Sequence, residues 1–196
     1  MSRCRVPDKG RIDHARPVRF TFDGRVIEGR QGDTVASALL ANGVHLMGRS
    51  FKYHRPRGVV SAGSEEPNAL IGTQRGGPDR FEPNTRATMQ EVWEGLTTES
   101  QNKWPTLAFD VGAINNRLAR FLPAGFYYKM FIHPRSFWKH VYEPFIRQSA
   151  GLGRSPTLPD PDHYASRNLH CDVLVVGAGP AGLAAALAAG RAGAQV

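Results

Sequence analysis

The sequence predicts an α+β domain followed by the start of an α/β domain, and two observations carry this prediction. Within residues 17–48, two segments that alternate as strands do are joined by a short turn and lead into a helical pattern. Further along, the continuous apolar segment Val173–Val176 leads through closely spaced glycines into a helix rich in Ala and Leu. Between these regions, residues 93–150 are rich in aromatic side chains and predict a helical connector.

The first domain is predicted to begin with a hairpin. Val18–Phe22 alternates as a strand, Asp23-Gly24 is a two-residue turn signal, and Arg25–Gly29 returns as the second strand. A further strand is expected over Arg86–Val92, so that the domain covers residues 17–92 after a basic tail at residues 1–16.

A helix is expected directly after the hairpin. Asp33 or Thr34 is the predicted N-cap, and Asn42-Gly43 ends the helix. Its apolar face consists of Val35, Leu39 and Leu40. Hairpin followed by helix is the opening of a β-grasp fold, and residues 17–48 resemble the start of [2Fe–2S] ferredoxin-like domains. Such domains carry closely spaced cluster cysteines in the next loop, whereas residues 48–58 contain none, so we expect a cluster-free ferredoxin-like domain that serves packing or interface formation.

That cysteine-free loop alternates cations with rings. Its cations are Arg49, Lys52, Arg55 and Arg57, and its rings are Phe51, Tyr53 and His54. Three interpretations stay open: an anion, flavin-phosphate or subunit-interface site, a single-stranded nucleic-acid site, and a structured loop whose arginines pair with Glu65 and Glu66. The sequence places no partner beside His54, so we expect this histidine to be structural.

The remaining histidines are scattered without the spacing of metal ligands. Among them, His133, His140, His163 and His170 include no pair separated by four residues on one helix. We therefore predict no metal site and assign no catalytic residue.

The connector predicts two helices, a short amphipathic one over Asp110–Phe121 and a second one over Ser136–Ser149 that is broken near Pro144. Residues 126–131 are too apolar to lie wholly in water. The connector is therefore expected either to pack on later domains of the same protein or to form a docking surface for another subunit. A linker over residues 151–170 follows.

The glycines at the start of the second domain have the spacing Gly-x-Gly-x-x-Gly. Gly177 permits a tight turn, Gly179 lets the backbone approach a pyrophosphate, and Gly182 lets the helix pack closely on the strand. The free N–H groups at the helix start would then face the phosphates. The predicted cofactor-binding residues are Gly177, Ala178, Gly179, Pro180, Ala181 and Gly182.

Residues 171–196 thus predict the first β-α unit of a Rossmann-type dinucleotide-binding domain. A transmembrane helix over Val173–Gly190 is disfavoured by the glycines and the proline in its first half. The acidic residue that binds a ribose hydroxyl is expected ~20 residues beyond the glycines, whereas Gln195 would only begin the second strand. NAD, NADP and FAD therefore remain undistinguished, and we expect the chain to be the N-terminal piece of a longer protein.

Composition favours a cytoplasmic protein with an anionic partner or cofactor. The formal net charge is +8, and the polar, basic start has no apolar segment of the secretory kind. Cys4 and Cys171 are the only cysteines, and their separation gives neither a disulfide framework nor a metal-site spacing.

Four segments together resemble one family. They are FKYHRPRGVVSAGSEEPNALI, SQNKWPTLAFDVGAINNRLARFLPAGFYYKMF, FWKHVYEPFIRQSAGLG and VVGAGPAG, and they resemble the N-terminal part of alpha subunits of heterotetrameric sarcosine oxidases. The resemblance implies a flavin-dependent oxidoreductase that demethylates sarcosine to glycine with formation of hydrogen peroxide and passes the one-carbon unit to tetrahydrofolate. It implies FAD and the sarcosine site in the beta subunit, FMN between alpha and beta, and NAD held by Gly177, Gly179 and Gly182.

The implied partners are the beta, gamma and delta subunits, with no nucleic acid and no membrane, and sarcosine and tetrahydrofolate would bind outside these residues. This part alone is expected to be inactive and to supply dinucleotide binding and subunit packing. Two alternatives stay open: the alpha subunit of a related opine or amine oxidase, and a non-catalytic interaction module.

Overall fold

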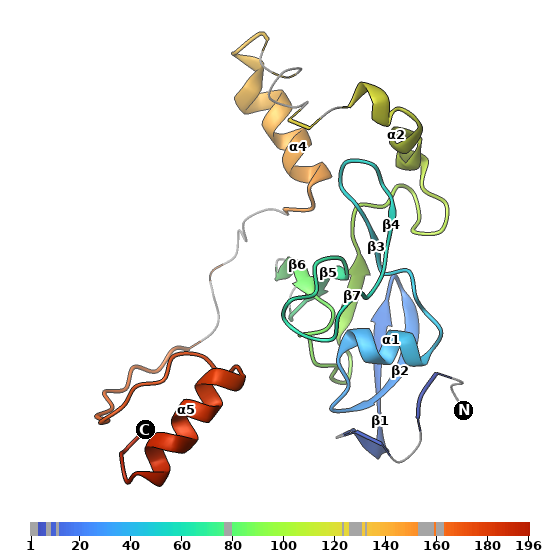
Figure 1. Ribbon diagram of the computed structural model, residues 1–196. Helices are drawn as coiled ribbons and strands as arrows, with labels where there is room; N and C mark the ends of the chain where they lie inside the picture. The colour runs from blue at the N-terminus through green and yellow to red at the C-terminus, as the bar shows by residue number, and fades with distance from the viewer. Residues whose placement is uncertain are drawn as a thin grey trace. The chain divides into compact units, whose positions relative to one another are not determined.

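The computed structural model describes residues 4–6, 9–10, 12–76, 80–122, 124–125, 131, 133–152, 159 and 163–196 (Figure 1). The chain divides into two compact units, Met1–Leu158 and Pro159–Val196. The first unit contains a mixed sheet with one helix packed on it, and the second contains a single longer helix.

The sheet of the first unit has five strands in the order β2-β1-β7-β5-β6. Their bounds are β1 Asp13–Phe22, β2 Arg25–Gln31, β5 Leu70–Gln74, β6 Phe81–Arg86 and β7 Thr97–Ser100. Neighbouring strands are antiparallel except β1 and β7, which pair in parallel through Thr21 with Thr97 and Phe22 with Thr98. A separate two-stranded ladder joins β3, Gly48–Arg49, to β4, Pro56–Arg57.

The predicted hairpin is confirmed, with longer strands than expected. Phe22 pairs with Arg25 across the turn, and both turn residues, Asp23 and Gly24, have positive φ angles of 49° and 75°. Positive φ at both central residues is the conformation whose twist matches that of the flanking strands, which explains why Asp-Gly stands there. The register shifts between Asp13 and Pro17, next to a proline that has no N–H to donate to the ladder.

Helix α1 spans Val35–Ala41, and of the two predicted N-cap residues Thr34, not Asp33, is the N-cap. The Thr34 hydroxyl accepts a bond from Ser37 N at 3.2 Å, and the Ser37 hydroxyl accepts one from Thr34 N at 3.0 Å, which completes a capping box. Asp33 is buried instead, and it accepts bonds from Arg30 N at 2.7 Å and from the Ser37 hydroxyl at 2.7 Å. Asn42 ends the helix as predicted.

The strand expected over Arg86–Val92 is wrong, because β6 ends at Arg86 and the chain then turns under the start of α1. Val35 N donates to the Gln90 carbonyl at 2.7 Å and Ala36 N donates to the Ala87 carbonyl at 2.9 Å. The first N–H groups of a helix have no partner within the helix. The Gln90 and Ala87 carbonyls accept these N–H groups of α1 and are therefore not available for pairing with another strand.

The core lies between α1 and the sheet (Figure 1). Its largest apolar members are fully buried: Phe20, Val35, Leu39, Met47, Ile71 and Leu96. The predicted apolar face of α1 is confirmed at Val35 and Leu39, whereas Leu40 packs against the core while partly exposed.

The two helical segments predicted for the connector are present, but each is divided into shorter pieces. Residues 110–121 form three short turns, η1 Val111–Ala113, α2 Ile114–Arg117 and η2 Ala119–Phe121. The later helix consists of the π-helical turn η3, Trp138–Tyr142, and α4, Glu143–Ser149. Pro144 lies in the first turn of α4, where the π-helical turn passes into the α-helix, so the helix changes its hydrogen-bond pattern next to this proline. Of the apolar segment 126–131, residues 126–130 lie outside the described residues.

The second unit contains α5, Pro180–Arg191. The chain beyond α5 returns to the start of the unit, where the N–H groups of Asp172 and Val173 donate to the Gln195 carbonyl at 2.8 and 3.2 Å. Within the described part of the chain, no helix has the length and apolar character needed to cross a membrane.

Candidate functional site

The predicted glycine turn connects the extended segment 173–176 to α5. Gly177 has a φ of 112°, which side chains other than glycine rarely adopt. Gly179 is the N-cap of α5 with extended backbone angles, φ −72° and ψ 171°. A Cβ placed on Gly179 would meet no described atom within 4 Å, so this backbone is open to a ligand.

Gly182 has the contact that the motif requires. A Cβ at this position would overlap the carbonyl oxygen of Gly177 and lie 3.3 Å from Cγ1 of Val175. A larger residue would therefore separate α5 from the segment that precedes it.

The remaining predicted residues, Ala178, Pro180 and Ala181, complete the turn. Pro180 is the first residue of α5, and the first intrahelical bond described runs from Leu183 N to the Gly179 carbonyl at 2.9 Å. The N–H groups of Ala181 and Gly182 precede it and have no acceptor within the helix. Free N–H groups and the helix dipole together suit an anion such as a phosphate.

The apolar side chains around this turn are exposed in the second unit. Val176 is 89% exposed and Leu174 is 78% exposed, although the prediction was a strand buried on both faces. Residues 173–176 pair with no strand among the described residues. A strand with a single helix cannot cover both of its faces, which is the physical reason for the difference.

The basic loop of the first unit, residues 48–58, contacts a buried carboxylate from a later segment, Asp110. Asp110 Oδ2 lies 2.7 Å from His54 Nδ1 and 3.7 Å from Arg49 Nε. Asp110 Oδ1 accepts bonds from Trp104 N at 2.9 Å and from Gly112 N at 3.2 Å. The structure thus gives His54 a carboxylate partner that the sequence did not place beside it. No local signal could have paired His54 with Asp110, because 56 positions separate them.

The cations of this loop have partners other than those expected. Arg49 donates to the Leu107 carbonyl at 2.8 Å and to the His54 carbonyl at 3.0 Å. Lys52 and Arg55 lie over the ring of Tyr53, each 4.7 Å from its centroid. Cations stacked on a ring in this way help to order the loop.

Glu66 does not pair with these arginines but holds its own loop. Its carboxylate accepts backbone bonds from Val60 and Ser61 at 2.7 Å, from Asn68 at 2.7 Å and from Ala69 at 3.0 Å. Burial raises the pKa of Glu66, but the four N–H donors outweigh it and lower the pKa to about 2. The expectation that the arginines of the basic loop pair with Glu66 is therefore wrong, because the Glu66 carboxylate binds backbone N–H groups of its own loop.

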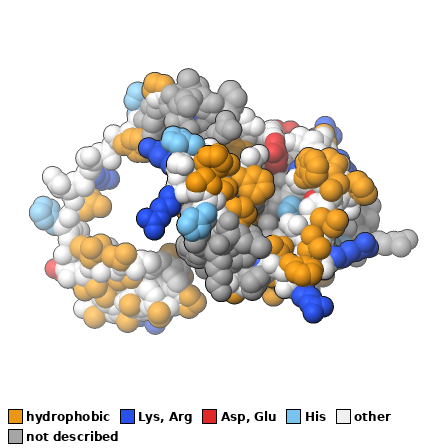
Figure 2. Space-filling model, turned by 90° about the horizontal axis from the view of Figure 1, so that it is seen from above, with side chains coloured by type: hydrophobic (Ala, Val, Ile, Leu, Met, Phe, Trp, Pro, Cys, Tyr) orange, Lys and Arg blue, Asp and Glu red, His pale blue; other side chains and the backbone are white. Residues whose placement is uncertain are grey.

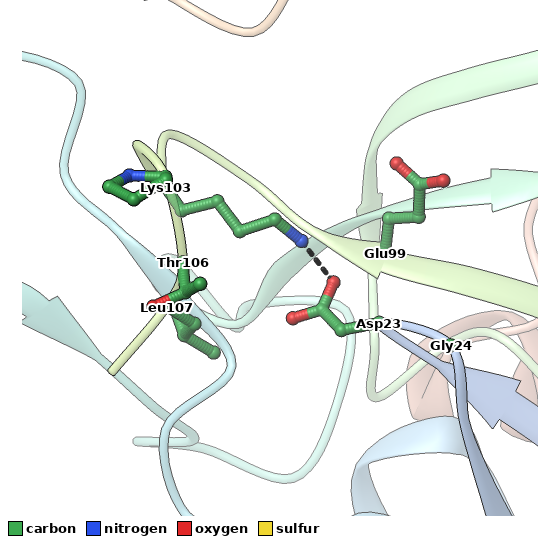
Figure 3. Close-up of a pocket in the computed structure, with 7 residues that line it drawn as sticks. Asp23, Gly24, Glu99, Lys103, Thr106 and Leu107 are labelled. Carbon is green, nitrogen blue, oxygen red and sulfur yellow. Dashed lines mark hydrogen bonds and ion pairs between the residues drawn. The ribbon is translucent and has the colours of Figure 1, made fainter. Parts of the chain in front are cut away.

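A hollow of about 370 Å³ lies beside the hairpin turn (Figure 3). Lys103 reaches across it to pair with Asp23, while the Glu99 side chain points away from that pair. The Ser100 hydroxyl and Ser100 N also donate to Asp23, at 2.6 and 2.8 Å. None of the sequence-predicted site residues lines this hollow.

Potential metal ligands do not converge in the described part of the chain. It contains no group of three or more His, Cys, Asp or Glu side chains arranged for an ion, and Cys4 and Cys171 are exposed and form no disulfide. The prediction that there is no metal site stays a prediction.

Comparison with known proteins gives one matching family model and relatives that match all or nearly all of this chain. Residues 15–103 match the model of a 2Fe-2S iron-sulfur cluster binding domain. The whole chain is 61% identical to the sarcosine oxidase subunit alpha of Rhizobium meliloti (strain 1021) over 196 residues. The chain is homologous to sarcosine oxidase alpha subunits.

Two further sarcosine oxidase alpha subunits, from Corynebacterium sp. strains P-1 and U-96, are each 37% identical over 95% of this chain. The chain spans 20% of the length of the Rhizobium relative and 14% of each Corynebacterium relative. Among solved structures, L-proline dehydrogenase from P. horikoshii matches 52% of this chain and 18% of its own with 23% identity and a TM-score of 0.39.

The donor chemistry of this alpha-subunit homologue does not fit the cluster that the family model describes. Iron–sulfur clusters are held by cysteine thiolates, and residues 15–103 contain no cysteine. The loop after α1 carries Arg49, Tyr53 and His54 instead, and these side chains bond to carbonyls and to Asp110.

Proposed function

We propose that this chain is part of the alpha subunit of a flavin-dependent sarcosine oxidase, an oxidoreductase that demethylates sarcosine to glycine within a multi-subunit assembly. The observation that carries the proposal is the 61% identity over the entire chain to a sarcosine oxidase alpha subunit. The proposed assembly has beta, gamma and delta subunits, uses FAD and FMN outside the residues described here, forms hydrogen peroxide, and transfers the one-carbon unit to tetrahydrofolate.

Within that subunit, the proposed role of residues 177–182 is to hold the pyrophosphate of a dinucleotide, with NAD as the favoured cofactor. The left-handed Gly177, the open backbone of Gly179 and the close approach of Gly182 to Gly177 each support this role. When bound, NAD supplies a nicotinamide ring that can exchange a hydride. This chain's residues contribute N–H donors and the space for the phosphates.

Substitution of Gly179 tests the dinucleotide site in the full-length subunit within its assembly. Gly179→Val adds a side chain where a Cβ has room and the backbone is extended, so the fold tolerates it while the pyrophosphate is blocked. We expect NAD affinity, measured by isothermal titration calorimetry, to fall at least about tenfold.

Gly190→Ala is the matched control, because Gly190 is also surrounded by open space but lies in the last turns of α5. It should leave NAD affinity unchanged. Equal affinity in Gly179→Val and the unsubstituted protein would refute the site, and a preference for FAD or NADP in the same titration would identify the cofactor instead.

For the ferredoxin-like domain we propose a packing role without a cluster. The absence of cysteine from residues 15–103 supports this. Iron and acid-labile sulfide, measured in the purified assembly after anaerobic isolation, are expected at trace levels relative to protein. A stoichiometric amount of both, with the visible absorption of a [2Fe–2S] centre that maps to this domain, would overturn the proposal.

A further inference from the structure

The helical turns after Asp110 expose the apolar side of an amphipathic segment. Val111, Ile114, Leu118 and Phe121 follow each other at intervals of three or four residues along the successive turns η1, α2 and η2. They are 42%, 56%, 44% and 65% exposed. An amphipathic segment normally turns this side toward its own core.

The opposite, polar side of the same segment is the side that contacts the rest of the unit. Arg55 Nε donates to Asn116 Oδ1 at 2.8 Å, and Asn115 Nδ2 donates to the Lys52 carbonyl at 3.3 Å. The Tyr53 hydroxyl donates to the Leu122 carbonyl at 2.9 Å, and Asp110 fixes the start of the segment to His54. The apolar stripe is therefore held outward by specific bonds.

The charge beside the stripe has a single sign. Residues 111–142 contain five Lys and Arg residues and no Asp or Glu. Arg117 and Arg120 are exposed next to the stripe, and Arg55 is exposed on the loop that holds it. The space-filling view, seen from above relative to Figure 1, shows hydrophobic side chains gathered with Lys and Arg side chains beside them (Figure 2).

We propose that Val111, Ile114, Leu118 and Phe121, with Arg55, Arg117 and Arg120 at their rim, form a docking surface for a separate protein subunit. The partner surface has an apolar centre ringed by Asp and Glu. The proposal deepens the proposed function, because it takes the multi-subunit assembly as given. Of the two roles expected for the connector, packing on later domains of the same protein and docking of another subunit, the proposal assigns docking to this stripe.

Three arguments favour this occupant. An apolar centre with arginines and an aromatic ring has the composition of protein–protein interfaces, and complementary rim charge selects and steers a separately folded partner. A second copy of this chain that met the same face would bring cations against cations. Nucleic acid would gain nothing from the aliphatic part of the stripe, since bases stack on aromatic rings.

Photo-cross-linking in the complete assembly tests the surface directly. The photoreactive residue p-benzoylphenylalanine is incorporated at Leu118 and, as a control, at Val26, which is 69% exposed on strand β2. We expect Leu118 to cross-link to a different polypeptide, at a peptide that contains Asp or Glu, and Val26 to give no such product. A product within the same polypeptide, with a second copy or with nucleic acid, or no product, overturns the proposal.

Charge reversal provides the second measurement. Arg117→Glu with Arg120→Glu should weaken association of the partner about tenfold at low salt, as measured by sedimentation, whereas Arg25→Glu should not. Unchanged association, or the absence of any co-purifying polypeptide, counts against the surface. Sarcosine oxidation by the assembly is measured separately: loss of cross-linking with intact oxidation overturns only the surface, and a cross-linked assembly that does not oxidise sarcosine overturns only the proposed function.

Discussion

Glu66 and Asp110 are buried carboxylates that stabilise irregular backbone. Each accepts hydrogen bonds from backbone N–H groups that are not paired in the sheet. Glu66 takes four such bonds from its own loop. Asp110 takes two, and in addition contacts His54 and Arg49. Unpaired N–H groups are costly when buried, so one carboxylate can replace several backbone acceptors.

Glu66 makes stability sensitive to acid. Its pKa is about 2 in the folded protein against 4.5 in the unfolded chain, so the ionised carboxylate stabilises the fold above pH 4.5 and this contribution is lost as the pH falls toward 2. The shift corresponds to on the order of 3 kcal/mol. Urea unfolding between pH 2 and 6 should show this loss.

Glu66→Gln should lower stability at pH 6 and flatten that part of the pH profile, because the amide places an NH₂ group against backbone donors. Glu99→Gln is the control, since Glu99 is an exposed carboxylate on strand β7, outside the loop that Glu66 holds. An unchanged acid profile in Glu66→Gln would contradict the role given to Glu66.

The sequence indicated residues whose roles are local but not those defined by distant partners. The turn at Asp23-Gly24 and the positive φ at Gly177 depend on adjacent backbone, and both were predictable. His54 and Asp110 meet only when the loop after α1 folds against the segment before α2. Gly112 belongs to the same contact, since a Cβ there would overlap the His54 ring.

At the scale of elements, α1 is fixed at its start by both its own side chains and a neighbouring segment. Thr34→Ala removes the hydroxyl that accepts the Ser37 N–H and should cost about 1 kcal/mol of unfolding free energy, measured by urea denaturation. Thr34→Ser keeps the hydroxyl and should stay close to the unsubstituted protein. Equal stability of the Ala and Ser variants would show that the Gln90 and Ala87 carbonyls alone suffice.

Strand β7 illustrates why one element was missed. Its residues, Thr97–Ser100, are polar and were assigned to the connector, yet Thr98 and Ser100 are buried. The Thr98 hydroxyl donates to the Thr21 carbonyl at 2.7 Å and Ser100 donates to Asp23. Apolar alternation cannot reveal a strand whose buried positions are satisfied by hydrogen bonds.

At the scale of the whole molecule, the described core belongs to the first unit alone. Its buried apolar residues all lie between Phe20 and Leu96. We therefore expect residues 1–158 to unfold cooperatively on their own, as followed by circular dichroism during heating, and residues 159–196 to show no such transition.

Ile71→Ala, which removes a fully buried side chain, serves as a control in residues 1–158 and should cost about 2–5 kcal/mol. A transition in residues 1–158 that is broad and insensitive to Ile71→Ala would contradict the expectation of an independent core.

The place of β7 in the sheet also determines when the fold can form during synthesis. The pairs β1–β2 and β5–β6 are hairpins of residues close in sequence, but only β7 joins them, through pairs such as Thr21 with Thr97 and Ile71 with Ser100. On the ribosome, the two hairpins must wait until Ser100 has left the exit tunnel. Until then their inner edges offer unpaired N–H and C=O groups, which favour edge-to-edge association between nascent chains.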